Sequence, residues 1–337
     1  MEPLSLTKIK NQCCRCMQFC KSFMTVHQVE IIMYTADILV SHPFIVLRRQ
    51  CQVRSDSEEY HITPLSLMPI VATLVHRKGF KVLFKGLFSI MVLRGVQLGI
   101  EQILSRLTSW PSKLPPTWYI NKDWLLHFLL KSSTFIITAP IYSASVINTV
   151  AVSGDFTSRK FLTFQKYDYP LSFWHTMFQT ALFGIVKYAF RQATLSLIAA
   201  MLYLNHCFDE TERDACQSVE GGIRLQDRQD IFLKASVMSY LSAEILFYPL
   251  ETVVHRLILQ GTRTFTNDLD CGSAVVQILS AHNGFVDCYD NITWLEGKLG
   301  LYKGFGALLM QAFLYHYCIK FVSFVWHYIK KYKKTFS

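Results

Sequence analysis

The chain has 337 residues and a net charge of +10, and 51% of its residues are hydrophobic whereas only 17% are charged. About a quarter of the residues in soluble proteins are charged, so the composition argues against an ordinary soluble protein. We find no phosphate-binding loop, serine-hydrolase elbow or metal-spaced histidine pair, and no basic face interleaved with aromatic residues. We therefore expect a membrane protein that is not an enzyme, with no cofactor, no metal and no nucleic-acid partner.

The N-terminal segment, residues 1–24, is a tail marked by four cysteines: Cys13, Cys14, Cys16 and Cys20. A zinc site needs a second cysteine pair or histidines at a suitable spacing, and this cluster has neither. Two interpretations stay open, reduced thiols or S-acylation beside the first membrane span. The tail lacks the long apolar run of a cleaved signal peptide and the Arg/Ser-rich composition of a transit peptide.

A helix of about 20 apolar residues crosses the roughly 30 Å hydrocarbon layer of a bilayer. Six segments approach this length with few charges, namely residues 24–47, 86–107, 132–154, 173–207, 231–259 and 305–329. They predict an all-α membrane protein with six transmembrane helices and both termini on the same side. Basic residues gather at span ends and in the C-terminal tail, where they suit anionic lipid surfaces.

The spans form an internal repeat. Pro43, Pro140 and Pro249 lie late in the odd-numbered spans, about one hundred residues apart. A pattern of Gly, four residues, an aromatic residue, Lys and Gly follows the first span at 79–86 and the fifth at 297–304, and each copy leads into the next span. The middle copy lacks it. We therefore predict repeats at residues 25–110, 111–225 and 226–337, the second degenerate and the third carrying a basic tail.

These segments resemble the signature of the mitochondrial carrier family (solute carrier family 25), in which each repeat reads Pro, any residue, acid, two residues, base. The stretches 140–145, 248–264 and 301–306 are similar to a divergent outer-membrane branch of that family. The resemblance covers about residues 25–330. It implies three hairpins of helices related by a pseudo-threefold axis. In that branch a long extension precedes the first span, whereas about two dozen residues precede it here.

In such carriers the repeated acids and bases pair around a ring and close one side of the bundle. This chain holds Ile45, Tyr142 and Glu251 at the acid positions, and Arg48, Ser145 and Val254 at the base positions. The family pattern places the third acid beside the first base, so the resemblance implies one residual gate pair, Arg48 with Glu251. In the alternative, Arg48 reaches the lipid headgroups and Glu251 pairs locally with His255 or Arg256.

A second gate in carriers lies on the even-numbered spans, and it looks dismantled here: Glu101 follows Ile100, but Leu104 stands where the base should be. The charges within the spans should face the bundle interior, because an unpaired charge in lipid is costly. They are Asp37, Arg94, Glu101, Lys187, Arg191, Glu244 and Lys320. Lys187 and Arg191 lie one helical turn apart, so they predict either a groove for an anionic headgroup or solute, or charges that pair among themselves.

The repeat signature residues are Pro43, Pro140, Pro249, Lys85, Gly86, Tyr302, Lys303 and Gly304. With two of three gate pairs missing, we expect a scaffold of the mitochondrial outer membrane that has lost transport. The resemblance implies roles in mitochondrial fission and fusion, cristae organisation and lipid homeostasis. It implies as partners membrane lipids, proteins of fusion and fission, cristae-organising complexes and lipid-transfer contacts. The alternatives are an inner-membrane carrier with an asymmetric gate, and a lipid scramblase or insertase that uses the charged groove.

Overall fold

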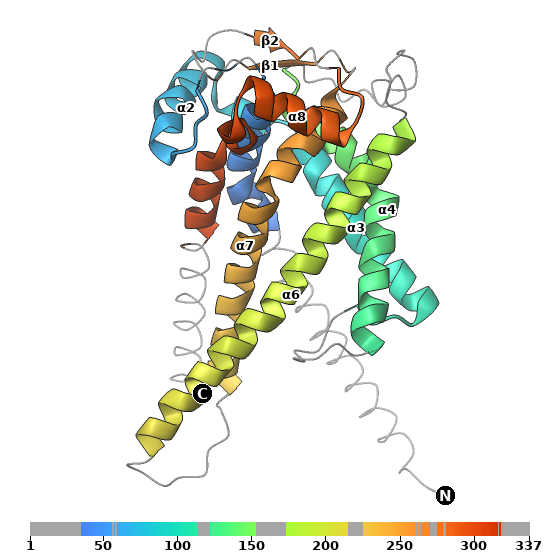
Figure 1. The fold of residues 1–337 in the computed structure, drawn as a ribbon, viewed down its shortest axis with the longest axis vertical. Coiled ribbons are helices and arrows are strands. Elements are labelled where there is room, and N and C mark those ends of the chain that lie inside the picture. The colour runs from blue at the N-terminus through green and yellow to red at the C-terminus, as the bar shows by residue number, and fades with distance from the viewer. Residues whose placement is uncertain are drawn as a thin grey trace, which may run out of the picture.

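The structure is a computed structural model that describes residues 35–112, 122–152, 173–214, 225–260 and 281–315, apart from residues 56 and 58. It also describes short stretches between residues 262 and 278, and residue 317. Four long helices carry most of the fold: α3 (Leu87–Thr108), α4 (Lys122–Val150), α6 (Phe173–Asp214) and α7 (Leu225–Leu259). Further helices cover residues 35–53 and 305–315. Helix α3 packs against α4, α4 against α6, and α6 against α7 (Figure 1).

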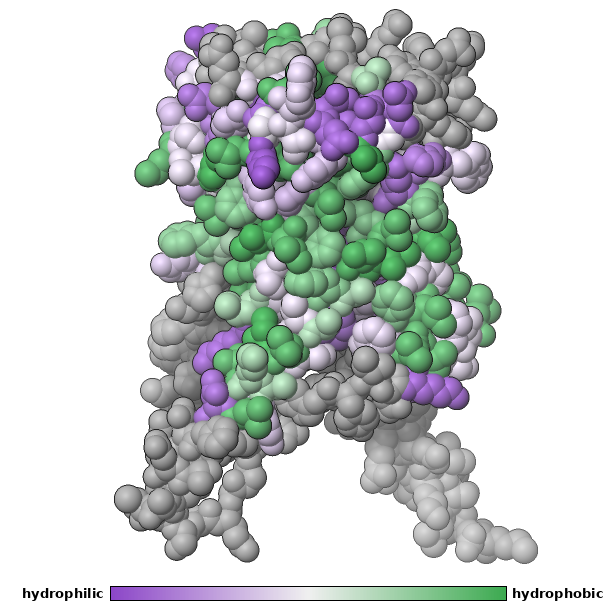
Figure 2. Space-filling view, viewed as in Figure 1, coloured by the Kyte–Doolittle hydropathy of each residue, from purple (hydrophilic) through white to green (hydrophobic). Residues whose placement is uncertain are grey.

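Within the described residues, four helices are long and apolar enough to span a membrane: Phe80–Thr108, Lys122–Val150, Trp174–Asn205 and Ile231–Leu259. They match the second to fifth predicted spans. Large apolar side chains along α6, such as Trp174, Phe178 and Met201, remain exposed, as lipid-facing residues do. On the face drawn in Figure 2, an apolar belt crosses the middle of the molecule below a more polar end.

The predicted start of the third span is wrong. Helix α4 begins at Lys122, ten residues before the expected Ser132, because Lys131 is neutralised by Glu101 of α3 at 2.6 Å and so does not end the apolar segment. The helix ends at Val150, and not at Gly154. Parts of the first and sixth predicted spans, and all of the N-terminal cysteine cluster, lie outside the described residues.

Short elements lie across one end of the long helices, which we call the closed end (Figure 1). They are α2 (Pro64–Lys78) with η1 (Phe80–Phe84), α8 (Phe285–Leu295) with η2 (Lys298–Tyr302), and two strands. The two copies of the glycine pattern adopt the same conformation. Gly79 and Gly297 have φ of 80° and 75° before a 3₁₀ turn, and Gly86 and Gly304 have φ of 69° and 79° after it. Glycine tolerates these left-handed values without steric cost.

Among the described residues, one strand pair occurs beside the helices, which the all-α expectation did not include. Strand β1 (Phe265–Asn267) pairs with β2 (Val275–Gln277) in antiparallel register, with Phe265 opposite Gln277. The short, β-branched and aromatic strands suit a pleated, half-buried surface. They lie at the closed end with α2 and α8 (Figure 1).

The apolar core also lies at the closed end. One cluster joins Leu47 and Cys51 to Leu67 and Leu74 of α2. A second cluster joins residues from three distant segments: Val53, Val146, Ile147, Val150, Val254, Ile258 and Leu259. Because these residues come from all three predicted repeats, burial of apolar surface holds the repeats together at this end.

Candidate functional site

Arg48, on the helix of residues 35–53, lies at the centre of the site. It is only 7% exposed. Its Nη1 lies 2.8 Å from Oε2 of Glu244, and its Nη2 lies 2.9 Å from Oε1 of Glu251. The two carboxylates stand seven residues apart on α7, which places them two turns apart on one face of the helix. The structure therefore brings together the two predicted gate residues and adds a second carboxylate.

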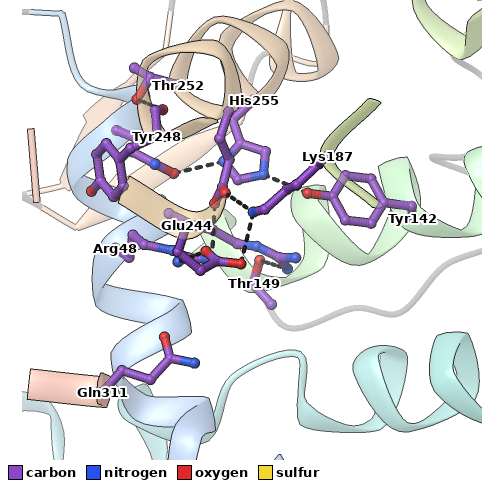
Figure 3. A network of polar contacts seen from close by, with 12 residues as sticks. Arg48, Tyr142, Thr149, Lys187, Glu244, Tyr248, Thr252, His255 and Gln311 are labelled. Atoms are coloured by element: carbon purple, nitrogen blue, oxygen red, sulfur yellow. Dashed lines mark hydrogen bonds and ion pairs between the residues drawn. The ribbon is translucent and has the colours of Figure 1, made fainter. Parts of the chain in front are cut away.

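Lys187 of α6 completes the arrangement from the opposite side (Figure 3). Its Nζ lies 2.8 Å from Oε1 of Glu244 and 3.0 Å from Oε2 of Glu251. Each carboxylate thus bridges the same two cations. We call Arg48, Lys187, Glu244 and Glu251 the ionic network. Buried charges are tolerated when they are paired in this way, and removal of one member leaves another uncompensated.

The contacts of the network differ from three alternatives that the sequence left open. Arg48 is buried, so it does not reach the lipid headgroups. Glu251 does not pair with Arg256, whose partner is Glu296. Lys187 is neutralised by two carboxylates, so it does not combine with Arg191 into a doubly positive groove face.

The middle repeat contributes neutral groups where the family pattern has charges. The hydroxyl of Tyr142, at the acid position, lies 2.9 Å from Nε2 of His255, and Nδ1 of His255 lies 2.7 Å from Oε1 of Gln52. The guanidinium of Arg49 lies over the Tyr142 ring, 5.6 Å from its centroid, and donates to Oγ1 of Thr149 at 3.1 Å. Hydrogen bonds and a cation–π contact therefore replace ion pairs on this side of the site.

The remaining base positions are also without charge. Arg49 reaches Ser145, at the second base position, only at 3.5 Å. Val254, at the third, belongs to the second apolar cluster. The site is consequently asymmetric: helix 35–53, α6 and α7 supply all four charges of the network, and α4 supplies none.

A second buried ion cluster lies closer to the end of the bundle. Arg256 of α7 pairs with Glu296, which also accepts from Nζ of Lys303 at 2.6 Å. Lys303 further donates to the backbone carbonyls of Arg54, Ser55 and Ser57 at 3.1–3.2 Å. These carbonyls follow the C-terminus of helix 35–53, where the helix dipole favours a cation. Burial lowers the pKa of Lys303, while its hydrogen bond to Glu296 opposes that shift.

The signature glycines are places of close helix contact. A Cβ on Gly86 would lie 2.8 Å from Cγ2 of Thr149 in α4, and a Cβ on Gly304 would lie 2.5 Å from Cβ of Cys51. The carbonyl of Lys85 lies 2.9 Å from Nε2 of His42. Each copy of the pattern thus packs against the C-terminal end of a helix from another predicted repeat.

The other signature residues have structural contacts as well. Tyr302 stacks on Tyr248 with ring centroids 5.9 Å apart, and the Tyr248 hydroxyl donates to the carbonyl of Lys303 at 2.8 Å. Pro140 lies inside α4 and Pro249 inside α7. Pro43 lies within the helix of residues 35–53.

Of the candidate groove charges, the structure brings Lys187 and Glu244 together in the ionic network, and it places the others in different contacts. Glu101 pairs with Lys131 at 2.6 Å, and Arg191 lies over the ring of Tyr240, 5.4 Å from its centroid. Arg94 is exposed on α3, and Asp37 on helix 35–53. Within the parts of the chain that the structure describes, no cluster of His, Cys, Asp and Glu could hold a metal ion. Lys320 lies outside the described residues.

Sequence reasoning missed the contacts of Glu244 with Arg48 and of Arg256 with Glu296. Glu244 precedes the signature proline by five residues, so the repeat pattern gives it no role. Its spacing of two helical turns from Glu251 is the signal that could have identified it. Glu296 stands directly before the signature Gly297, outside the repeat pattern, so that pattern gives it no role.

Comparison with known proteins adds an independent finding. Residues 232–334 match the family described as mitochondrial carrier protein. The chain is 35% identical over 295 residues to the mitochondrial outer membrane protein SLC25A46 of Gallus gallus, which covers 83% of this chain and 70% of the relative. It is 33% identical over 295 residues to the protein of that name from Danio rerio, covering 83% and 72% of the two chains. For Homo sapiens the identity is 32% over 299 residues, covering 83% and 68%.

Proposed function

This chain belongs to the mitochondrial carrier family, in the SLC25A46 branch of multi-pass proteins of the mitochondrial outer membrane, and from this premise we propose that it is a carrier-like scaffold that transports no solute. The scaffold acts in mitochondrial fission and fusion, cristae organisation and lipid homeostasis. Its partners are membrane lipids and proteins of the fusion, fission and cristae-organising complexes. It has no enzymatic activity and binds no nucleic acid.

The proposal includes six transmembrane helices in three pseudo-threefold repeats. Four apolar helices of spanning length support it. So does the identical conformation of the glycine patterns that end at Gly86 and Gly304. The contacts of these glycines with Thr149 and Cys51 run from the first repeat to the second, and from the third to the first. This is the order that a cyclic arrangement of three repeats requires.

The ionic network carries the functional proposal. A carrier alternates between two states, so each of its gates must be weak enough for solute binding to open it. Here Arg48 and Lys187 are each held by both Glu244 and Glu251 in a buried site, so opening would separate four short contacts. Removing one partner from a buried pair costs about 3–5 kcal/mol, and this network holds four contacts where the sequence indicated a single pair. A latch of this strength favours a single closed state.

The opposite gate supports the same conclusion. Glu101 bonds to Lys131 on the adjacent helix α4 at 2.6 Å, and Leu104 occupies the position of the expected base. The population of a closed state falls appreciably only when another state has a comparable free energy. Among the described residues of the even-numbered spans there is no matching ring of charges, so the alternative state lacks that stabilisation.

Uptake into liposomes tests the loss of transport. Purified protein is reconstituted into liposomes, which are loaded in turn with nucleotides, keto acids and amino acids. A transporting member of the mitochondrial carrier family is reconstituted in parallel as a positive control. We expect no uptake above that of protein-free liposomes. Saturable uptake that depends on counter-exchanged internal solute would refute the scaffold.

Location bears on the alternatives from the sequence. An inner-membrane carrier is overturned by the outer-membrane location of this branch. The charged groove of a scramblase or insertase has less support, because Lys187 is neutralised within the network and leaves Arg191 without the second charge.

A further inference from the structure

The loop that follows α7 forms contacts with all three predicted repeats. We call its described residues, 264–267, 269 and 275–278, the strap. Its two strands pair with each other at the closed end, above α8 in the view of Figure 1. Thr266 and Asn267 are buried at 0% and 2% exposure, which is unusual for polar loop residues. One side of the strap, with Thr266, Asn267 and Leu269, is therefore packed into the bundle, while Phe265 and Val275 are exposed.

Leu269 attaches the strap to the first repeat. This side chain is 1% exposed and belongs to the apolar cluster formed by Leu47, Leu67 and Leu74. Next to it, Nζ of Lys78, in the last turn of α2, donates to Oδ1 of Asn267 at 2.8 Å. An apolar contact of Leu269 and a hydrogen bond of Asn267 thus both join the strap to the first repeat.

Other strap residues attach it to the second repeat. The backbone N–H of Val152, just beyond the end of α4, donates to the carbonyl of Phe265 at 2.7 Å. The side chain of Ile278 packs against the second apolar cluster, which includes Val146 and Val150 of α4. The strap itself continues from α7 of the third repeat through Gln260, so a single segment connects the three repeats.

We propose that the strap is a built-in lock that holds the closed end shut. This inference rests on the proposed function and adds a device to it. Opening that end requires the three repeats to move apart, and each movement removes Leu269 from its cluster or breaks the Val152–Phe265 hydrogen bond. The strap acts in parallel with the ionic network, which lies deeper in the bundle and uses none of the strap residues.

Cysteine accessibility in the full-length protein tests the lock. A Ser145→Cys reporter is placed on α4 beside the network, where Ser145 is 0% exposed. The protein is held in lipid nanodiscs and treated with a membrane-impermeant maleimide, and labelling of the reporter is followed by site-resolved mass spectrometry. The labelling rate of a buried thiol reports how often the structure opens.

Leu269→Ala is compared with Ile292→Ala. Both remove one buried aliphatic side chain at the closed end, but Ile292 packs within the third repeat, against Val253, Leu257 and Cys288. Because it weakens contacts between repeats, Leu269→Ala should raise the labelling rate by about tenfold or more, while Ile292→Ala changes it by less than about twofold. Equal rates in the two variants, or no increase in either, would overturn the lock.

A milder pair covers the case in which Leu269→Ala does not accumulate as folded protein. Lys78→Met removes the hydrogen bond to Asn267, and Arg77→Met removes the neighbouring exposed charge of the same helix turn. Lys78→Met should speed labelling about two- to threefold over Arg77→Met; no difference between them would count against the lock. Solute uptake is not measured, so this result and the liposome result can fail independently.

Discussion

Glu251 is the most enclosed member of the ionic network, with a side chain that is 2% exposed between Arg48 and Lys187. Replacing it by Gln keeps the shape but removes the charge that both cations share. We expect the free energy of unfolding in detergent micelles to fall by about 3 kcal/mol, because a buried cation loses a partner. Denaturant titration measures this loss.

Glu59→Gln is the matched control for that prediction, because Glu59 is exposed at the closed end. It should change the free energy of unfolding by no more than about 0.5 kcal/mol. Combining Glu251→Gln with Arg48→Met should cost less than the sum of the two single losses, since the pair is removed together. Additive losses would show that the two residues do not interact.

The thiol of Cys288 in α8 predicts how the stability of the protein depends on pH. It is fully buried, and burial raises the pKa of its thiol from the ordinary 9.0 to about 12. The folded protein keeps the thiol protonated where the unfolded chain would ionise it. This group therefore has no effect on stability below about pH 9, and it lowers stability as pH rises from 9 toward 12, by up to about 1.4 kcal/mol per pH unit.

Unfolding midpoints at pH 8 and pH 10 measure this effect. Cys288→Ala should remove part of the alkaline loss seen in the wild type, and alkylation of Cys288 at pH 10 should be slow until the protein unfolds. Rapid alkylation of Cys288 in folded protein at pH 8 would contradict its burial.

At the scale of elements, two glycines with nearly the same φ separate the cost of a positive φ from the cost of packing. Gly79 and Gly304 have φ of 80° and 79°. A Cβ on Gly79 would meet nothing within 4 Å, whereas a Cβ on Gly304 would lie 2.5 Å from Cβ of Cys51. Gly79→Ala should cost about 1–3 kcal/mol from its backbone conformation alone, because a φ of 80° with a ψ of 167° favours glycine.

Gly304→Ala should cost about 1–3 kcal/mol more than Gly79→Ala, because the turn would have to move away from helix 35–53. Parallel denaturant titrations of the two variants compare the costs. Equal costs would mean that the turn does not pack against that helix.

The elements differ in how far the sequence predicts them. Hydropathy identified four spans because a membrane-spanning helix requires a run of consecutive apolar residues. It placed the start of α4 too late, because Lys131 is neutralised by Glu101 and does not end the helix. The glycine pattern marked the segments 79–86 and 297–304, where glycines with positive φ flank a turn, but it did not predict that the turns are the 3₁₀ helices η1 and η2. The strands were missed, because three-residue strands give no periodic signal and their register depends on partners elsewhere in the fold.

The site was predicted only where the family pattern reaches. That pattern suggested the contact of Arg48 with Glu251, which the structure brings to 2.9 Å. It could not assign Lys187 to the same carboxylates, since the two segments are more than fifty residues apart and nothing local specifies which helix faces meet. A charged residue within a span therefore looks unpaired in the sequence when its partner lies on a distant segment, and only the packing of the helices shows the pair.

At the scale of the whole molecule, three devices stabilise the same closed end: the ionic network, the cluster of Arg256, Glu296 and Lys303, and the apolar core beneath the strap. A protein that alternates between two states needs the energies of those states to be close. Stabilisation concentrated at one end instead favours a single conformation, which suits a scaffold to which other proteins bind in the outer membrane.

The distance across the closed end tests this account most directly. Spin labels placed at exposed Arg77 of α2 and Trp294 of α8 report the separation of the first and third repeats by pulsed electron–electron double resonance. The account predicts one distance population in lipid nanodiscs, unchanged by nucleotides, keto acids or amino acids. A second, longer population that grows when one of these solutes is added would contradict it.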